Sequence, residues 1–229
     1  MKLFLLLFFI SCTALAQDST VTRSDYDTSV LCVFKYFKNN TPYKYYEKKG
    51  AVLHGKTYDY YPNSFIRYHR NYWNGVLHGM QCSFTDEGTL VKTESYTKGT
   101  LNGRQRTYSN GYLVTDINYS NGVLSGESRT NYPTSSFPQQ IIQYANGKKN
   151  GEGKYYYAGN FIMTEYTYVN DNLQGISRTF YDNGMVQSVG SYVNNEEEGE
   201  WNYFTTDGAH EKTVVYKKGV AIKTIDIKK

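Results

Sequence analysis

The chain has 229 residues, with 25 Lys and Arg against 21 Asp and Glu, and a formal net charge of +4 at pH 7. This charge is mild and the basic residues gather near both ends, so we expect no nucleic acid among the partners. Tyrosine occurs 25 times and glycine 20 times, a composition that favours strands and turns over helices.

The first residues resemble an export signal. Lys2 precedes an apolar run from Leu3 to Ile10, and the small residue Ala16 ends the segment, which is the pattern of a secretory signal peptide. We expect residues 1–16 to be removed near Ala16 and the protein to be exported, to the periplasm, the outer membrane or the medium. A lipoprotein site at Cys12 is the alternative. No later segment approaches the roughly 20 apolar residues of a transmembrane helix.

Three further regions follow in chain order. Residues 17–29 are polar and match no later pattern, so they predict a flexible linker. Residues 30–50 predict N-terminal capping strands. Residues 51–229 predict a repeat array with a C-terminal cap, in which Ile225 and Ile227 end an alternating strand whose neighbouring lysines discourage edge-to-edge association.

Two cysteines remain after the signal, Cys32 and Cys82. Export permits a disulfide, but in a strand array these residues lie about two repeats apart. That is roughly 20 Å at about 4.8 Å per strand, whereas a disulfide needs α-carbons closer than about 7 Å. We expect two unpaired thiols, at least partly buried.

An eight-residue motif recurs about every 24 residues. YWNGVLHG starts at Tyr72, YTKGTLNG at Tyr96 and YSNGVLSG at Tyr119; we call the last residue of each motif the closing glycine. A leucine usually stands two residues before the closing glycine, and an aromatic residue five after it. The structural repeat residues are Tyr72, Gly79, Tyr96, Gly103, Tyr119, Gly126, Tyr144, Gly151, Tyr168, Gly175, Tyr192 and Gly199.

Each period contains two turn signals, so one repeat is predicted to be one β-hairpin. Dipeptides such as Asn74-Gly75 tolerate the left-handed backbone of a tight hairpin turn, and a second glycine usually follows the closing glycine by eight or nine residues. Because a lone hairpin is marginal in water, consecutive hairpins must pair. We predict an all-β fold, an elongated single antiparallel meander sheet or β-hairpin solenoid, in which each tyrosine packs on the equivalent ring of its neighbour. The closing glycine leaves room for a ring or a chain to approach.

The Tyr-x-Asn-Gly-x-Leu-x-Gly unit resembles the bacterial variant of the MORN repeat, over about residues 50–223. The resemblance implies an elongated sheet of stacked hairpins with no enzyme active site in the repeats. Some bacterial members carry an antitoxin label, and MORN arrays elsewhere serve as scaffolds, dimerisation modules or proposed lipid binders.

The polar residues give no catalytic, cofactor or metal site. His54 and His78 share one column and stand about 10 Å apart at two strand spacings, too far for one zinc ion. The acidic run at residues 196–200 lacks a calcium-loop pattern. Glu94, Asp116 and Glu165 do not share a column, as two hydrolytic carboxylates facing one cleft would require.

We therefore expect a non-catalytic exported repeat protein, which acts as a protein-interaction or scaffold module at the cell envelope and binds an unknown protein or envelope component. One alternative is an envelope lipid or glycan binder, with peripheral lipid contact through the lysine-rich ends or stacking by surplus tyrosines. Another is an antitoxin-like partner of a toxin protein, which an export signal disfavours. The surplus tyrosines lie outside the regular columns: Tyr43, Tyr45, Tyr68, Tyr112, Tyr155 and Tyr166.

Overall fold

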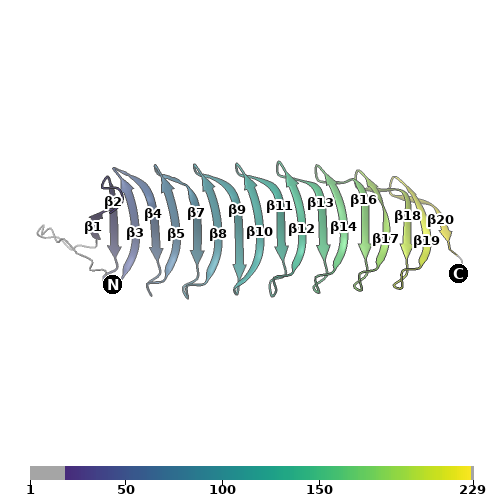
Figure 1. The fold of residues 1–229 in the computed structure, drawn as a ribbon, viewed down its shortest axis with the longest axis horizontal. Coiled ribbons are helices and arrows are strands. Elements are labelled where there is room, and N and C mark those ends of the chain that lie inside the picture. Colours follow the sequence, from purple (N-terminus) through teal and green to yellow (C-terminus); the bar gives the residue numbers. More distant parts are fainter. Residues whose placement is uncertain (1–18, 228–229) are drawn as a thin grey trace, which may run out of the picture.

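The computed structural model describes residues 19–227. In this part of the chain all regular structure is β, and the strands pair antiparallel in chain order, from β1 at one end to β20 at the other. The strands lie across the long axis of an elongated sheet (Figure 1). The predicted all-β, single antiparallel meander sheet is confirmed.

The strands are β1 Ser19–Arg23, β2 Val30–Tyr36, β3 Pro42–Lys49, β4 Val52–Tyr60, β5 Ile66–Trp73, β6 Val76–Leu77, β7 Gly79–Phe84, β8 Leu90–Thr97, β9 Thr100–Ser109, β10 Tyr112–Ser120, β11 Val123–Asn131, β12 Pro138–Ala145, β13 Lys148–Tyr156, β14 Ile162–Val169, β15 Asn172–Leu173, β16 Gly175–Phe180, β17 Val186–Val193, β18 Glu196–Phe204, β19 His210–Lys217 and β20 Val220–Asp226.

The turns at one long edge of the sheet tie each repeat to the one before it. Their two central residues both have positive φ, for example 46° at Asn74 and 83° at Gly75, as the tight hairpin turn requires. The amide of the second central residue donates to a carbonyl of the preceding repeat. Gly75 N donates to Leu53 O at 2.8 Å, and Gly99 N donates to Leu77 O at 2.7 Å.

Two of these turns lack the glycine and make an extra hydrogen bond instead. Asp171 and Asn195 hold φ at 73° and 70°. The Oδ1 atom of Asp171 accepts from the amide of Lys149 at 2.8 Å, and that of Asn195 accepts from Leu173 at 2.7 Å. The departures from the turn consensus therefore add a side-chain link to the preceding repeat.

The closing glycines form bulges. Each lies opposite the tyrosine of the following strand, as Gly79 lies opposite Tyr96. Their φ values fall between 75° and 110°, and the strand that carries them shifts register against the preceding strand, the geometry of a bulge that favours glycine. A Cβ on Gly103 would meet the side chain of Ser95 at 3.1 Å. A neighbouring side chain thus approaches the closing glycine, whereas the predicted approach of a ring is wrong, and the bulge conformation is what requires glycine there.

The tyrosine column lies on one face of the sheet, which we call the tyrosine face. Among the described residues no two consecutive column tyrosines are in ring contact. Equivalent rings are separated by two strand spacings, about 10 Å, beyond the roughly 4.5 to 7 Å of an aromatic pair. Four of the column tyrosines instead lie opposite a leucine of the next repeat, as Tyr72 lies opposite Leu77. Tyr144 lies opposite Lys149 and Tyr192 opposite Glu197. The predicted ring-on-ring stack is therefore wrong, and a non-aromatic side chain, most often leucine, stands opposite each tyrosine.

Rings do lie on glycines, but not on the closing ones. A Cβ on Gly153 would stand 2.6 Å from the ring of Tyr168, and one on Gly190 would stand 2.1 Å from the ring of Trp201. Tyr168 and Trp201 are only 7% and 4% exposed. The tyrosine face therefore has its most buried aromatic cluster in the C-terminal half. Tyr192 belongs to this cluster, and burial is the main reason that its pKa is raised to about 12.

A second tyrosine column ties the repeats together at the other long edge. The hydroxyl groups of Tyr61, Tyr132, Tyr157 and Tyr181 donate to backbone carbonyls of the next repeat. The distances are 3.0, 2.7, 2.9 and 2.8 Å, to Phe84, Tyr156, Phe180 and Phe204. Consecutive repeats are thus hydrogen-bonded at both edges as well as along their strands.

The N-terminal region differs from the prediction in one segment. Residues 19–23, placed in the linker 17–29, form β1 and pair with β2 because β2 offers an open edge. Residues 30–50 contain the hairpin β2–β3. Leu31 lies opposite Lys48 in this hairpin, at the positions that Gly55 and Tyr72 occupy in the next repeat, so the hairpin keeps the pairing of a repeat without its glycine and tyrosine. The expected signal peptide at residues 1–16, including Cys12, lies outside the described residues.

Substituting the glycines beneath the rings will destabilise the sheet. Gly153→Ala and Gly190→Ala should each lower the free energy of unfolding by about 1 to 3 kcal/mol, because the added methyl group overpacks a buried ring. Gly159→Ala is the matched control, since its Cβ would meet only the exposed Phe161 ring at 3.3 Å. Urea denaturation checks the order. Equal losses at all three positions would contradict the packing described here.

Removing a hydroxyl of the second tyrosine column will weaken the contact between repeats. Tyr157→Phe and Tyr181→Phe should each cost about 1 kcal/mol, the net value of one intramolecular hydrogen bond. Tyr112→Phe is the control, because Tyr112 is 43% exposed. Thermal or urea unfolding of the three variants provides the comparison, and a cost at Tyr112 as large as at Tyr181 would refute the assignment.

Candidate functional site

The face opposite the tyrosines carries a row of charged side chains, and we call it the charged face. The residue three positions after the closing glycine is basic in four consecutive repeats, at Arg106, Arg129, Lys154 and Arg178. These residues alternate along the row with Asp116, Ile141 and Glu165, each directly paired with its neighbours. The charged row thus has four basic side chains and two acidic ones.

The N-terminal part of the charged row is centred on Asp116. Its Oδ2 atom receives Arg104 Nη1 at 2.6 Å and Arg106 Nε at 3.1 Å. Its Oδ1 atom is buried without a hydrogen-bond partner among the described residues. Arg129 lies opposite Asp116 but donates its Nε–H to Asn131 Oδ1 at 2.7 Å. Arg104 and Arg106 therefore neutralise the Asp116 carboxylate.

The C-terminal part of the row is centred on Glu165. Lys154 Nζ lies 3.4 Å from Glu165 Oε1, and Arg178 Nη1 lies 3.7 Å from Glu165 Oε2. Burial lowers the pKa of Lys154, but the carboxylates of Glu165 and Glu152 outweigh it and raise that pKa above its usual value. The Arg178 side chain is 46% exposed. Arg178 therefore holds its carboxylate loosely and remains open to solvent.

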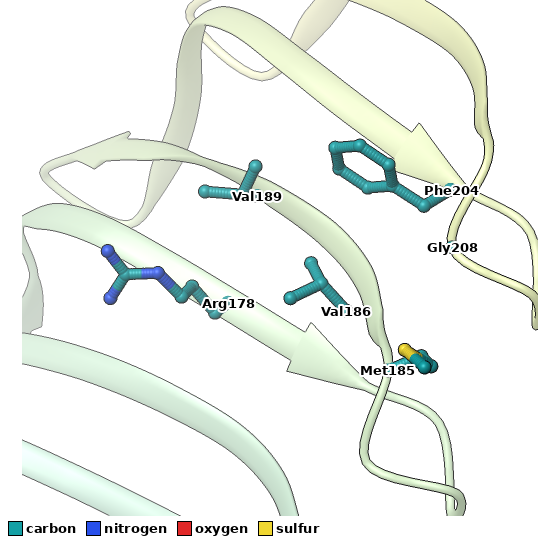
Figure 2. A pocket seen from close by; sticks show the side chains of 6 residues that line it. All are labelled: Arg178, Met185, Val186, Val189, Phe204 and Gly208. Atoms are coloured by element: carbon teal, nitrogen blue, oxygen red, sulfur yellow. The ribbon is translucent and has the colours of Figure 1, made fainter.

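Arg178 also borders an apolar depression. Figure 2 shows its guanidinium at one end, with Val186 and Val189 along the floor and Phe204 and Met185 towards the turns. The depression has a volume of about 350 Å³. A smaller depression of about 220 Å³ adjoins it. Arg178 lines both depressions, and Glu165 lines the smaller one. The arrangement offers an apolar side chain a place next to an exposed cation.

The N-terminal end of the same face is aromatic. Phe34 and Tyr45 rings lie 4.7 Å apart, and Tyr58 stacks on His69 at 4.7 Å with an angle of 18°. Tyr45 donates its hydroxyl to Glu47 Oε1 at 2.7 Å. Burial, together with hydrogen bonds that include the one to Glu47, raises the pKa of Tyr45 well above its usual value. These rings pack against one another, and the basic side chains of the charged row lie beyond them, from Arg106 to Arg178.

Cys82 lies opposite His69 on the charged face. Cys32 and Cys82 are free thiols and half-buried. Burial raises the pKa of the Cys82 thiol, so this group is held in its unreactive protonated form.

The acidic residues considered from the sequence fall on both faces. Asp116 and Glu165 lie in the charged row, whereas Glu94 lies on the tyrosine face, where it accepts from Gln105 at 2.8 Å and pairs with Lys92 at 2.7 Å. Each carboxylate is thus engaged by a cation. Residues 19–227 contain no cluster of three His, Cys, Asp or Glu side chains that could hold a metal ion.

The histidine column caps turns. His54 Nδ1 lies 3.1 Å from Asn74 Oδ1, and His78 Nδ1 accepts from the amide of Lys98 at 3.4 Å. The equivalent Glu198 accepts from the amide of Lys218 at 2.8 Å. The column, including the glutamate of the acidic run, therefore binds the turn of the next repeat.

The surplus tyrosines do not form one site. Tyr155 and Tyr166 belong to the aromatic cluster of the tyrosine face, where the Tyr155 hydroxyl lies 3.2 Å from that of Tyr168. The Tyr68 ring lies 4.2 Å from the Arg70 guanidinium carbon. Tyr43 lies against Phe37 at 5.2 Å, and Tyr112 is 43% exposed. These contacts are structural and scattered along the molecule.

Neither a family model nor a curated protein matches this chain. The likeness of its repeats to a known family thus rests on the motif columns. Within residues 19–227, no helix is long and apolar enough to cross a membrane.

Acid will weaken the aromatic end of the charged face through His69. Its Nε2 atom is buried without a partner among the described residues, and burial, assisted by Lys56, lowers its pKa below the usual 6.5. Below about pH 6.5 the imidazole is therefore protonated in the unfolded chain but still neutral in the folded chain. The contribution of neutral His69 to the free energy of unfolding is complete above that pH and declines below it.

The urea midpoint should fall between pH 7.5 and pH 5.5, and it should fall less in His69→Phe, which preserves the stacking on Tyr58. A variant with the same pH dependence as the wild type would show that His69 is not responsible.

Proposed function

We propose that this chain is a non-catalytic protein-binding scaffold of the cell envelope, whose charged face receives an acidic and apolar surface of its partner. The observation that carries the proposal is the run of four basic residues that ends at Arg178, directly beside the apolar depression. Protein interfaces centre on apolar pockets and arginine, surrounded by a polar rim.

Arg178 is the best-placed contact residue. Its separation from Glu165 is 3.7 Å and its side chain is 46% exposed, so an incoming carboxylate competes with a weak, solvent-screened pair. A planar guanidinium accepts a carboxylate through two parallel hydrogen bonds. The neighbouring depression supplies apolar burial, so the two features together select a partner that carries an acid next to an apolar side chain.

The sheet suits a scaffold because its repeats are fixed to one another. Turn amides join consecutive repeats at one long edge and tyrosine hydroxyls join them at the other. A partner on the charged face therefore meets side chains at spacings set by the strands. The envelope location rests on the export signal expected at residues 1–16.

A charge reversal at the depression tests the proposal. The double variant Arg178→Glu, Val189→Asp should lose at least about tenfold in capture of envelope proteins that the wild type retains, as expected for loss of an interface centre. The control Lys98→Glu, Val76→Asp makes the same charge change at a turn edge and should retain them. Quantitative mass spectrometry of the captured proteins gives the ratio.

Equal capture by both double variants would exclude the depression as the binding surface. Anionic vesicles and immobilised glycans, offered at two salt concentrations, form the second arm. Retention there, with no protein retained, would replace the proposal with a lipid-binding or glycan-binding role.

A further inference from the structure

Arg178 lies between two depressions of different chemistry. In the charged row Glu165, Arg178 and Val189 stand side by side on β14, β16 and β17. The apolar depression lies on the Val189 side of the guanidinium, as Figure 2 shows. The smaller depression lies on the Glu165 side. The guanidinium thus separates an apolar surface from a polar one.

The smaller depression has more negative than positive charge once Arg178 binds a partner. Its lining includes the carboxylates of Glu152 and Glu165 and the ammonium of Lys154. Lys154 Nζ lies 3.7 Å from Glu152 Oε2 and 3.4 Å from Glu165 Oε1, so one lysine serves two carboxylates. The Glu152 side chain is 75% exposed. A partner carboxylate that binds Arg178 therefore leaves this depression with one negative charge in excess.

The positions of the two depressions set the spacing of the groups that can fill them. Their central strands, β14 and β17, are two strand spacings apart, about 10 Å. The smaller depression extends to Glu152 and Ile176, close to the tight turns, whereas the larger one extends to Met185 and Gly208 at the other long edge. An offset of about three residues along the strands adds roughly 10 Å in that direction. The line that joins the depressions is therefore about 14 Å long, close to the roughly 13 Å that four residues of extended chain span.

We propose that the protein partner presents an extended segment with a basic, an acidic and an apolar side chain at alternate positions, the acidic one in the middle. This inference rests on the proposed function. The basic group binds Glu152 and Glu165, the carboxylate binds Arg178, and the apolar side chain fills the depression beside Val189. Because side chains at positions i, i+2 and i+4 of an extended chain share one face, all three reach the sheet together.

Exchange of ion pairs favours this order of side chains. In the free protein Arg178 Nη1 lies 3.7 Å from Glu165 Oε2. The partner's carboxylate takes Arg178 from Glu165, and the partner's basic group replaces Arg178 there, so every charge keeps a partner of opposite sign. A segment with its basic group in the middle would place a like charge against Arg178 and is disfavoured. Either chain direction presents the favoured order.

Binding of synthetic peptides to the full chain tests the order. Two fluorescein-labelled probes with blocked termini present it, one in each chain direction: Gly-Lys-Ser-Glu-Ser-Leu-Gly and Gly-Leu-Ser-Glu-Ser-Lys-Gly. The control peptide, Gly-Glu-Ser-Lys-Ser-Leu-Gly, has the same composition with the lysine in the middle. Fluorescence anisotropy at low salt gives the Kd values. At least one probe should bind about tenfold more tightly than the control, because the control places its ammonium against Arg178.

A charge exchange assigns the contact of the basic group. Glu152→Lys should weaken binding of the better probe about fivefold or more, because an attraction becomes a repulsion. The same probe with glutamate in place of its lysine should bind this variant as the original probe binds the wild type, which isolates the pairwise contact. Glu127→Lys is the matched control, since Glu127 occupies the same column one repeat earlier, and it should leave the Kd unchanged.

The outcomes separate this inference from the proposed function. Equal binding of probes and control, no binding of either probe, or a Kd unaffected by Glu152→Lys would each overturn the inference. Loss of envelope capture in the Arg178→Glu, Val189→Asp variant would still support the proposed function in those cases. Ordered binding of a probe, with capture unchanged in that double variant, would support the peptide site and contradict the proposed function.

Discussion

A sheet of one layer has no second layer to hold its strands in place, so each hairpin must fix its own register. In this chain the register depends on backbone conformations with positive φ, two at the tight turn and one at the closing glycine. The turn then donates its amide to the preceding repeat, from Gly75 to Leu53 and from Gly99 to Leu77. The turn residues that have positive φ are thus the same residues whose amides donate to the preceding repeat. The conformation of each turn therefore fixes the position of its repeat relative to the one before it.

This repeated register divides the molecule into positions that hold the fold and positions that are free to vary. On one face the column tyrosines, four of which lie opposite a leucine, provide the apolar packing. The position three residues after the closing glycine lies on the other face, and its neighbours differ from one end of the sheet to the other, from the His69 ring beside Tyr58 to solvent at Arg178. It is Tyr58, Cys82, Arg106, Arg129, Lys154, Arg178 and Asn202 in successive repeats. The chemical identity of the charged face lies in this free column.

The sequence predicted the hairpins because their turns need particular residues, such as Asn74 and Gly75, at a regular spacing. It misassigned the tyrosine contacts because a period of 24 residues crosses two strands, which separates equivalent rings. Strand β1 was missed because the polar residues 19–23 become a strand only beside the open edge of β2. The charged row could have been found from the four basic residues in one column; its link to the Phe204 depression required the paired strands.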